Sequence, residues 1–362
     1  MVEDLLPGAS PEGDTGSASW TAVGARVVGG ADNVAPAVWR LVNGGWVADR
    51  TVASTLFGRE QRLIGVGRHN GRLAAMGLVF SDYEARPRPS AWAEHAGVWR
   101  EVPTLREVFG GLRTQDVKDM ASGDLGFVVV GARDDRRGQQ MAGVWRSPDG
   151  LDWARPPDGT PLTGASGEVV TPLGVALGPP GVVVVGTRLP LTDVLPNVED
   201  GAVWWSGDGR RWERVHADEA FGGPGTQQPT VVAWSGSAFV AVGATADDVG
   251  RRMRPAAWVS ADGRSWRRAP VDAFGGDTEA ADARLTSLVS AGGCLIAGGL
   301  VGTAPRLWTS TDGLAWTPMQ PPANELDAHG KVLAAGDRGE LLVVLSEPTR
   351  SRVWKGVVPS MR

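Results

Sequence analysis

Trp145-Arg-Ser147-Pro-Asp149-Gly150-Leu-Asp-Trp153 is the stretch that decides the fold, because it returns three more times with the same spacing. The other copies span Trp204–Trp212, Trp258–Trp266 and Trp308–Trp316, and all four read Trp-x-Ser-x-Asp-Gly-x-x-Trp. Five fixed positions that recur four times do not arise by chance. The sequence therefore indicates an array of one supersecondary unit.

Three weaker copies extend the array toward both ends of the chain. Trp39–Trp46 keeps both tryptophans and an Asn-Gly turn, and Trp92–Trp99 keeps the tryptophan pair and a glycine. Val353–Gly356 keeps only the first half of the pattern. The first tryptophans are then roughly fifty residues apart, a period typical of propellers and other repeat folds. They lie at positions 39, 92, 145, 204, 258, 308 and 354.

Each unit has a second marker upstream of its first tryptophan, a short apolar run that ends in glycine. These runs are Trp20–Gly24, Leu73–Gly77, Phe127–Gly131, Val182–Gly186, Phe239–Gly243 and Cys294–Gly298, whereas Leu341–Leu345 in the last unit lacks the glycine. Another short strand precedes each run, as at Thr230–Trp234. Since Asp-Gly is a favoured hairpin turn, a unit is predicted to contain four antiparallel strands, with the hairpin between the third and the fourth.

Four antiparallel strands in a unit of this length are typical of a β-propeller blade. No segment has a sustained 3.6-residue apolar period, so we predict an all-β fold. The prediction is a β-propeller of seven four-stranded blades closed by the N-terminal segment, with six or eight blades as alternatives. Residues 1–19 are predicted to be a linker or the ring-closing segment, and residues 20–362 a single propeller domain. The predicted blades are centred on Trp39, Trp92, Trp145, Trp204, Trp258, Trp308 and Trp354.

The stretch Ser147-Pro-Asp149-Gly150-Leu-Asp-Trp153 and its three siblings resemble the Asp-box, or bacterial neuraminidase repeat, of the sialidase-like propeller superfamily. That box is commonly Ser-x-Asp-x-Gly-x-x-Trp, and here each copy lacks one residue between Asp and Gly. The resemblance implies the fold and a structural role for the box, on the rim away from an active site. It does not imply an activity, because the superfamily contains sialidases, other glycosidases and proteins without catalysis. The box residues are Ser147, Asp149, Gly150, Trp153, Ser206, Asp208, Gly209, Trp212, Ser260, Asp262, Gly263, Trp266, Ser310, Asp312, Gly313 and Trp316.

Composition excludes several classes of function. The net charge is −5, with 36 basic and 41 acidic residues interspersed, so a nucleic-acid footprint is not expected. The four histidines lie in different units without metal-ligand spacing, so no metal is expected, with Ca²⁺ in an Asp-rich loop as an alternative. No nucleotide or dinucleotide fingerprint is present, so no cofactor is expected. Cys294 is the only cysteine, in an apolar run typical of a core residue.

The catalytic set of a sialidase is missing from the sequence. Such an enzyme takes a tyrosine nucleophile and its glutamate from separate blades, whereas the only tyrosine, Tyr83, is directly followed by Glu84. Adjacent strand residues point to opposite sides, so we assign no catalytic residue. Other glycosidases need only two carboxylates about 5–10 Å apart, which the sequence leaves open. A pocket with two carboxylates, one with a raised pKa, would favour an enzyme.

Charged loops after the second strands form the possible binding face. Its residues are Tyr83, Glu84, Arg133, Asp134, Asp135, Glu199, Asp200, Asp247, Asp248 and Arg251. Phe-Gly pairs follow the fourth strand at Phe57, Phe109, Phe221 and Phe274, on the same face. We interpret them as hydrophobic plugs between blades, with an aromatic funnel for a ligand as the alternative.

The sequence favours a non-catalytic binding platform, a monomer that uses its loop-bearing face for a protein or carbohydrate partner. The alternative is a glycoside hydrolase or lyase of the Asp-box superfamily, and a third possibility is a structural domain of a larger exported protein. Met1–Pro7 does not resemble a secretory leader, and no apolar span of membrane length occurs. We therefore expect a cytoplasmic protein if the chain is complete, and an exported or cell-surface protein if an upstream leader has been trimmed.

Overall fold

The structure is a computed structural model of the chain. It describes residues 1–8, 20–28, 33–81, 86–104, 106–109, 114–135, 137–157, 161–165, 167–191, 198–246, 252–275, 282–319, 331–337, 340–346 and 351–357. Of the predicted binding-face residues, Tyr83, Glu84, Asp247, Asp248 and Arg251 lie outside these ranges.

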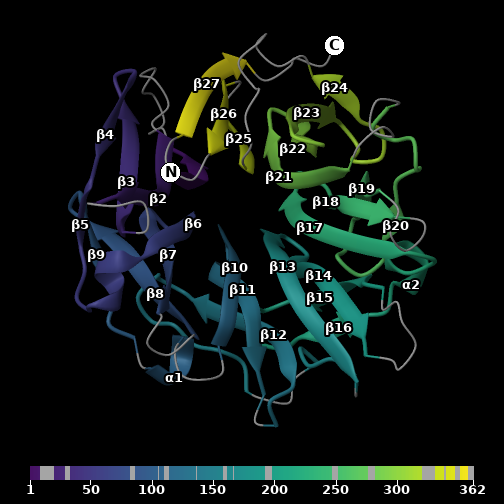
Figure 1. Ribbon diagram of the computed structural model, residues 1–362, viewed down its shortest axis with the longest axis horizontal. Coiled ribbons are helices and arrows are strands. Elements are labelled where there is room, and N and C mark those ends of the chain that lie inside the picture. The colour runs from purple at the N-terminus through teal and green to yellow at the C-terminus, as the bar shows by residue number, and fades with distance from the viewer. Residues whose placement is uncertain are drawn as a thin grey trace.

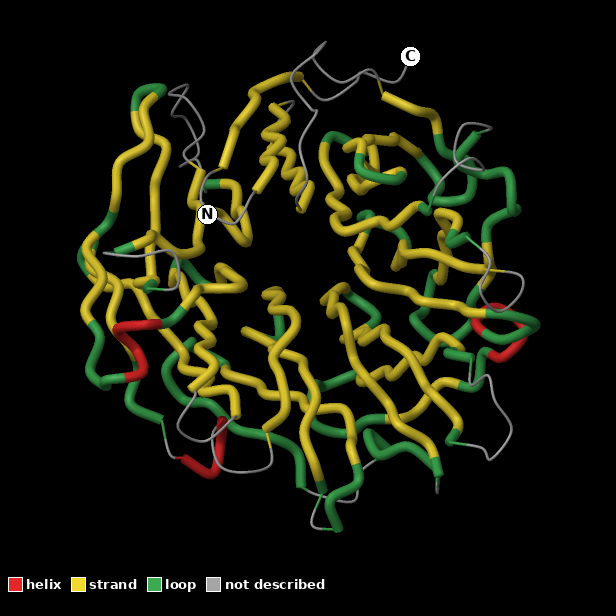
Figure 2. Tube along the Cα trace, viewed as in Figure 1, coloured by secondary structure: helices red, strands yellow, loops and turns green. Residues whose placement is uncertain are grey.

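Antiparallel sheets stand side by side around a central axis and form a ring (Figure 1). In each sheet the inner strand lies nearest the axis, and neighbouring inner strands contact one another around the ring. Short helices occur only in the connections among the described residues, toward the outside of the ring (Figure 2). This arrangement is an all-β propeller, as the repeat predicted.

The strands of the first three sheets follow one another along the chain. The first sheet contains β1 (Val2–Pro7), β2 (Trp20–Val27), β3 (Val34–Val42) and β4 (Gly45–Ala48). The second contains β6 (Arg62–His69), β7 (Arg72–Ser81), β8 (Arg86–His95), β9 (Val98–Glu101) and the added strand β5 (Arg50–Val52), which pairs with β9 in parallel. The third contains β10 (Thr114–Gly123), β11 (Gly126–Asp134) and β12 (Gln140–Ser147).

The other four sheets complete the ring. They contain β13 (Glu168–Gly178), β14 (Gly181–Pro190), β15 (Asp200–Ser206) and β16 (Glu213–Val215); β17 (Thr226–Trp234), β18 (Phe239–Ala246), β19 (Arg254–Ser260) and β20 (Arg267–Arg268); β21 (Ala283–Ala291), β22 (Cys294–Val301), β23 (Ala304–Ser310) and β24 (Thr317–Met319); and β25 (Lys331–Asp337), β26 (Glu340–Ser346) and β27 (Ser351–Val357). The connecting helices are η1 (Phe57–Glu60), α1 (Arg106–Phe109) and α2 (Asp218–Phe221).

The prediction of seven four-stranded blades requires a correction. Within the described ranges, five sheets contain four or more strands, and a single bridge between Arg146 and Ala154 takes the place of a fourth strand beside β12. These make six complete blades. The sheet β25–β27 contains three strands, because the described chain provides no fourth strand after the tryptophan of that unit.

The N-terminal strand belongs to the first sheet and does not add a strand to the last one. β1 pairs only with β2 in the described structure, and it meets the sheet β25–β27 through packing. Val2 is buried against Val344, and its amide donates a hydrogen bond to the Ser351 hydroxyl at 2.9 Å. The indole of Trp20 donates to Glu340 at 3.4 Å. The two ends of the chain therefore close the ring through side chains.

A glycine in the second strand of each complete blade faces a β-bulge in the inner strand. The bulge after Val117 in β10 brings the carbonyl of Asp116 so close to Gly131 that a Cβ there would overlap it. Gly24, Gly186, Gly243 and Gly299 face a backbone carbonyl in the same way, while Gly77 faces the side chain of Gln61. In the sixth unit the glycine at the bulge is Gly299, which directly follows the run Cys294–Gly298. The sheet β25–β27 lacks both the glycine and the bulge.

The Asp-Gly turns are fixed by their own side chains. Ser147 Oγ accepts the amide of Gly150 at 2.8 Å, and Asp149 Oδ1 accepts those of Leu151 and Asp152 at 2.9 Å each. Gly150 has a φ of +80°, which glycine adopts without steric cost. Trp153 is buried below the turn and donates to the Gly150 carbonyl. The same contacts recur in the turns at Ser260 and Ser310, and the two amide bonds to the aspartate recur in the turn at Ser206.

The Phe-Gly pairs act as plugs between blades, as predicted, at three of their four positions. Phe274 packs on both tryptophans of the next blade, with ring centroids 5.7 Å from Trp308 and 5.1 Å from Trp316. Phe109 and Phe221 pack on their following tryptophan pairs in the same way. Phe57 is only half-buried and lies under the guanidinium of Arg88 instead.

Candidate functional site

A pocket of about 220 Å³ lies over the sheet β13–β16, where its second and third strands meet the connection α2. Charged side chains line it from four separate segments of the chain. Glu168 begins β13, Arg188 lies near the end of β14, Arg214 lies in β16, and Asp218 begins α2. These segments meet here because strand pairing brings the ends of all four strands to one side of the blade.

Arg188 is the centre of this charge cluster. Its Nη2 lies 3.0 Å from Asp200 Oδ2 and 2.9 Å from Asp218 Oδ1, and its Nη1 lies 3.8 Å from Glu168 Oε1. Arg188 and Asp200 are direct cross-strand partners in β14 and β15, so the sheet register sets their distance. One guanidinium thus holds three carboxylates together.

Arg214 fixes Glu168 from the other side. Its Nη1 and Nη2 donate to the two carboxylate oxygens at 2.6 and 2.9 Å, a bidentate pair, and the amide of Ala165 donates to Oε2 at 2.8 Å. Burial acts to raise the pKa of Glu168, but the hydrogen bonds from Arg214 and Ala165 outweigh it and hold that pKa below its usual value. Glu168 is therefore an ionised, immobile group.

Asp200 has the opposite electrostatic environment. Burial raises its pKa above that of an ordinary aspartate, and the nearby charges of Asp218 and Glu168 add to this effect against the opposing charge of Arg188. Glu168 and Asp200 thus have pKa values shifted in opposite directions within one cluster, so that Glu168 is held ionised while burial favours the neutral form of Asp200.

Asp200 and Asp218 are close enough to act on one bond. Their oxygens can be no more than about 6 Å apart, since each lies within 3.0 Å of the same nitrogen, and retaining glycosidases separate their carboxyls by about 5–5.5 Å. Asp218 is open to solvent, with its side chain 75% exposed, whereas that of Asp200 is 18% exposed. The pair therefore combines a sheltered carboxyl with an accessible one.

The floor of the pocket is apolar. Phe221, at the end of α2, stacks on Trp258 of the next blade with a centroid distance of 5.2 Å. A side chain at Gly201 would collide with the Phe221 ring, so glycine at that position lets α2 fold down onto the sheet. Val203 and Val215 complete the apolar lining. The tryptophan pair of the next blade thus holds α2, and with it Asp218, in place.

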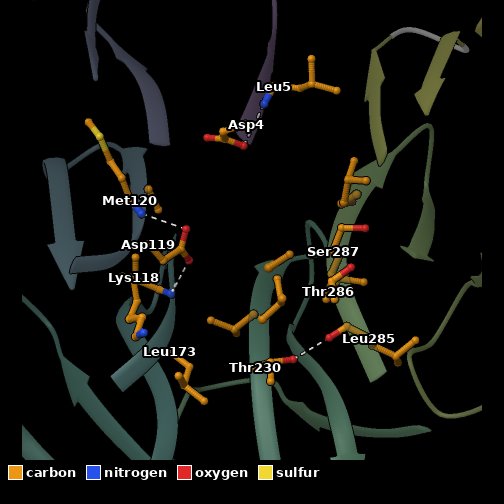
Figure 3. A pocket seen from close by; sticks show the side chains of 18 of the residues that line it. Asp4, Leu5, Lys118, Asp119, Met120, Leu173, Thr230, Leu285, Thr286 and Ser287 are labelled. Carbon is orange, nitrogen blue, oxygen red and sulfur yellow. Dashed lines mark hydrogen bonds between the residues drawn. The ribbon is translucent and has the colours of Figure 1, made fainter. Parts of the chain in front are cut away.

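A larger cavity of about 740 Å³ follows the propeller axis, lined by the inner strands (Figure 3). Its carboxylates are engaged by the backbone. Asp119 accepts the amides of Met120 and Val175, and Asp4 those of Leu5 and Val66, all at 2.8–2.9 Å. Each of these aspartates links its blade to the next. They are structural ties between inner strands, so the central cavity has less catalytic chemistry to offer than the cluster around Arg188.

The structure separates the predicted binding-face residues from one another. Asp200 lies in the cluster around Arg188. Glu199 instead contacts the next blade, where its carboxylate accepts from Gln228 and its carbonyl from the amide of Gln227. Arg133 is buried, near the sulfur of Met141. Asp134 ends β11 and takes part in an interaction there. Asp135 caps a turn by accepting the amides of Arg137 and Gln139.

Four residues of the cluster were missed by the sequence reasoning: Glu168, Arg188, Arg214 and Asp218. They are separated by up to fifty positions and form no motif. One signal was available, because aligning the second and third strands of that unit places Arg188 opposite Asp200. The other two strand positions depend on which way each side chain points, which the repeat alone does not define.

Among the residues that the structure describes, no group of three or more His, Cys, Asp or Glu side chains is arranged to hold a metal ion. No helix in those ranges has the length and apolar character needed to cross a bilayer.

The ring of sheets around an axial cavity defines the chain as a β-propeller. Neither known protein families nor curated proteins match its sequence. Among solved structures it is similar to an α-L-arabinanase of Penicillium chrysogenum, with 15% identity, 98% of this chain and 93% of that chain covered, and a TM-score of 0.51. At this identity the likeness establishes the fold alone.

Two further matches have lower TM-scores. A sialidase of Trypanosoma rangeli is 12% identical, with 93% of this chain covered and a TM-score of 0.46, and the match spans about half of the sialidase, 51%. A fucose-specific lectin of Aleuria aurantia is 12% identical, with 81% of this chain and 90% of that chain covered and a TM-score of 0.45.

The expectation of a non-catalytic binding platform is corrected by these comparisons. The solved structure that matches with a TM-score above 0.5 is a glycoside hydrolase, the arabinanase, and not a binding platform. It favours the alternative that the sequence left open. Because the likeness establishes only the fold, the activity has to be argued from the residues of the site.

Proposed function

We propose that the protein is a glycoside hydrolase whose reaction takes place at the cluster around Arg188, beside the pocket over β13–β16 that Arg188 and Asp218 line. The observation that carries the proposal is the pair Asp200 and Asp218, held within about 6 Å by Arg188, with the pKa of Asp200 raised by burial. In the sequence analysis, two carboxylates in a pocket, one of them with a raised pKa, were the feature expected to distinguish an enzyme from a non-catalytic binding platform. The likeness of the fold to that of an α-L-arabinanase is consistent with it.

Each carboxyl has a distinct role in the proposed reaction. Asp200, protonated, donates its proton to the glycosidic oxygen while the carboxylate of Asp218 attacks the anomeric carbon, and the bond from that carbon to the leaving oxygen breaks. Asp200 then removes a proton from water, which displaces Asp218 and regenerates both groups. Their short separation leaves no room for a water between carboxylate and sugar, and so favours this two-step course with retention of configuration.

Arg188 and Glu168 position the reacting pair in this scheme. Arg188 contacts both aspartates, and Glu168, fixed by Arg214, holds Arg188 from its opposite end. The negative charge of Glu168 also acts against ionisation of Asp200. A rigid second carboxylate therefore adds to the effect of burial and favours the protonated form of Asp200, which is the form a general acid requires.

The proposal is tested with aryl glycosides of several neutral and acidic sugars and the variants Asp200→Asn and Asp218→Asn. Each variant should lower kcat about 10²-fold or more. Loss at Asp200 should be smaller for a dinitrophenyl leaving group, which needs no acid, and loss at Asp218 should be recovered by azide. Glu219→Gln, one residue along α2 and exposed, is the matched control and should keep full activity. No hydrolysis by the wild type, or full activity of both variants, would refute the proposal.

We propose that the four Ser-x-Asp-Gly hairpins are Asp-boxes with a structural role, which agrees with the hydrogen bonds of Ser147 and Asp149 within their own turn. We also propose that residues 20–362 act as one domain, joined by β1 from the N-terminal segment. Carbohydrate is the proposed ligand class, and nucleic acid stays excluded by the charge distribution.

A further inference from the structure

The charges of the same pocket carry an inference about its substrate, which rests on the proposed function. We infer that the pocket over β13–β16 takes a single neutral sugar ring at the end of a glycan and rejects sugars that carry a carboxylate. The inference follows from which cations of the pocket are already engaged, from the balance of charge, and from the volume.

Recognition of an acidic sugar needs a cation that is free to pair with its carboxylate. Arginine does this best, through two parallel N–H donors. Both arginines of the described lining are engaged: Arg214 donates from both terminal nitrogens to Glu168, and Arg188 contacts Glu168, Asp200 and Asp218. To pair with either arginine, a substrate carboxylate would have to displace one of these protein carboxylates from its partner.

The balance of charge acts in the same direction. Three carboxylates share two guanidiniums in this cluster, so its charge is negative when all three are ionised. Asp218, the most exposed of them, faces the incoming ligand, and its charge would repel a uronic acid in a partly sheltered site. Hydroxyl groups meet no such repulsion, because a carboxylate accepts hydrogen bonds from them.

The size and lining of the pocket limit the ligand to one ring. Its volume, about 220 Å³, is below the roughly 300–1,000 Å³ of pockets that enclose drug-sized ligands. The lining combines the apolar side chains of Phe221, Val203 and Val215 with the carboxylates of Glu168 and Asp218. A sugar ring has a matching combination of groups, with C–H groups on its faces and hydroxyls at its edge. The geometry therefore suits a terminal residue.

The inference is tested by binding, so that it does not depend on turnover. Isothermal titration would compare methyl glycosides of neutral sugars (glucose, galactose, xylose and arabinose) with methyl glucuronide and methyl galacturonide. At least one neutral glycoside should bind, and the uronide of the same ring should bind at least about tenfold more weakly. Tighter or equal binding of a uronide would overturn the inference, and so would the absence of binding by every neutral glycoside.

A charge-reversal pair of variants assigns the effect to this pocket. Asp218→Lys adds a free cation at the exposed edge and should reduce the preference for the neutral sugar over its uronide about tenfold. Glu219→Lys makes the same change of net charge one residue away, outside the pocket lining, and should leave the preference unchanged. An equal effect of both variants would place the discrimination elsewhere and overturn the inference. If neutral glycosides bind but no aryl glycoside is hydrolysed, the proposed function fails while the inference stands.

Discussion

Asp200 and Asp218 share one hydrogen-bond donor, the Nη2 atom of Arg188, at 3.0 and 2.9 Å. Arg188 is also the cation that opposes the rise in the pKa of Asp200. Removing it should therefore move that pKa further up. In an Arg188→Met variant, the alkaline limb of the kcat/KM profile should shift to higher pH, together with a lower maximum because Asp218 loses its anchor. An unchanged limb in a folded variant would show that Asp200 is not the group whose titration limits the rate.

The raised pKa of Asp200 also predicts an effect on stability. A carboxyl whose pKa is higher in the folded than in the unfolded protein destabilises the fold once pH rises through the folded value. Asp200→Asn cannot ionise, so its stability relative to the wild type should increase from pH 4 to pH 8. At neutral pH its melting temperature should equal or exceed that of the wild type, although its activity is lost. A variant that melts lower at pH 8 than the wild type would contradict this.

Asp262 predicts a pH dependence of the opposite sign. Burial opposes ionisation of this residue, but the amides of Ser265 and Arg264 and the hydroxyl of Ser260 lower its pKa to about 2. Its stabilising contribution is complete above the usual carboxyl pKa and is lost as pH falls toward 2. Urea unfolding should show Asp262→Asn less stable than the wild type at pH 6, with the difference shrinking between pH 4 and pH 2. A constant difference would exclude the carboxylate as its cause.

The bulge glycines predict a steep cost for one methyl group. In Gly131→Ala, the new Cβ would overlap the carbonyl oxygen of Asp116, and a backbone atom cannot move aside as a side-chain end can. We expect a loss of about 3 kcal/mol or more in the free energy of unfolding. Gly356→Ala in β27 is the control, since no atom lies within 4 Å of the added Cβ, and it should be nearly neutral. Equal stability of the two variants would contradict the steric account.

The plugs between blades predict unequal effects for equivalent residues. Phe274 is buried on Trp308 and Trp316, so Phe274→Ala should cost about 3–5 kcal/mol. Phe57 has the same place in its connection but is only half-buried, so Phe57→Ala should cost much less. Chemical denaturation of both variants measures the difference. Similar losses would mean that burial against the tryptophan pair is not what stabilises the connection.

The repeat predicts the ring because its signals are local. The Asp-Gly turn and the run that ends in glycine each define strands within about ten residues, and copies of one hairpin unit have to bury the same faces against each other. What the repeat does not define is how the ring is completed at its ends. The pairing of β1 with β2, the parallel addition of β5 to β9 and the missing fourth strand beside β27 depend on segments that do not follow the pattern.

The candidate site was harder to predict for the same physical reason. Asp200 could be named because it lies in a charged loop beside a strand end. Its proposed partner, Asp218, lies on the one-turn helix α2. A helix this short shows no helical periodicity in the sequence. Glu168 and Arg214 come from β13 and β16, which are the two outer strands of one sheet and are not neighbours in it. Electrostatic coupling between residues on separate strands has no signature along the chain.

The closure of the ring by side chains has a consequence for how the protein comes apart. Every other junction between sheets is tethered by a covalent connection, but the junction of β1 with β25–β27 joins segments at the two ends of the described chain. Parting it breaks no strand ladder, since Val2 and Ser351 share a single hydrogen bond there. Solvent should therefore enter the molecule first at this junction, and the amide of Val2, which is bonded across it, should exchange its proton through an opening smaller than global unfolding. A covalent cross-link across this junction would slow the unfolding of the whole propeller.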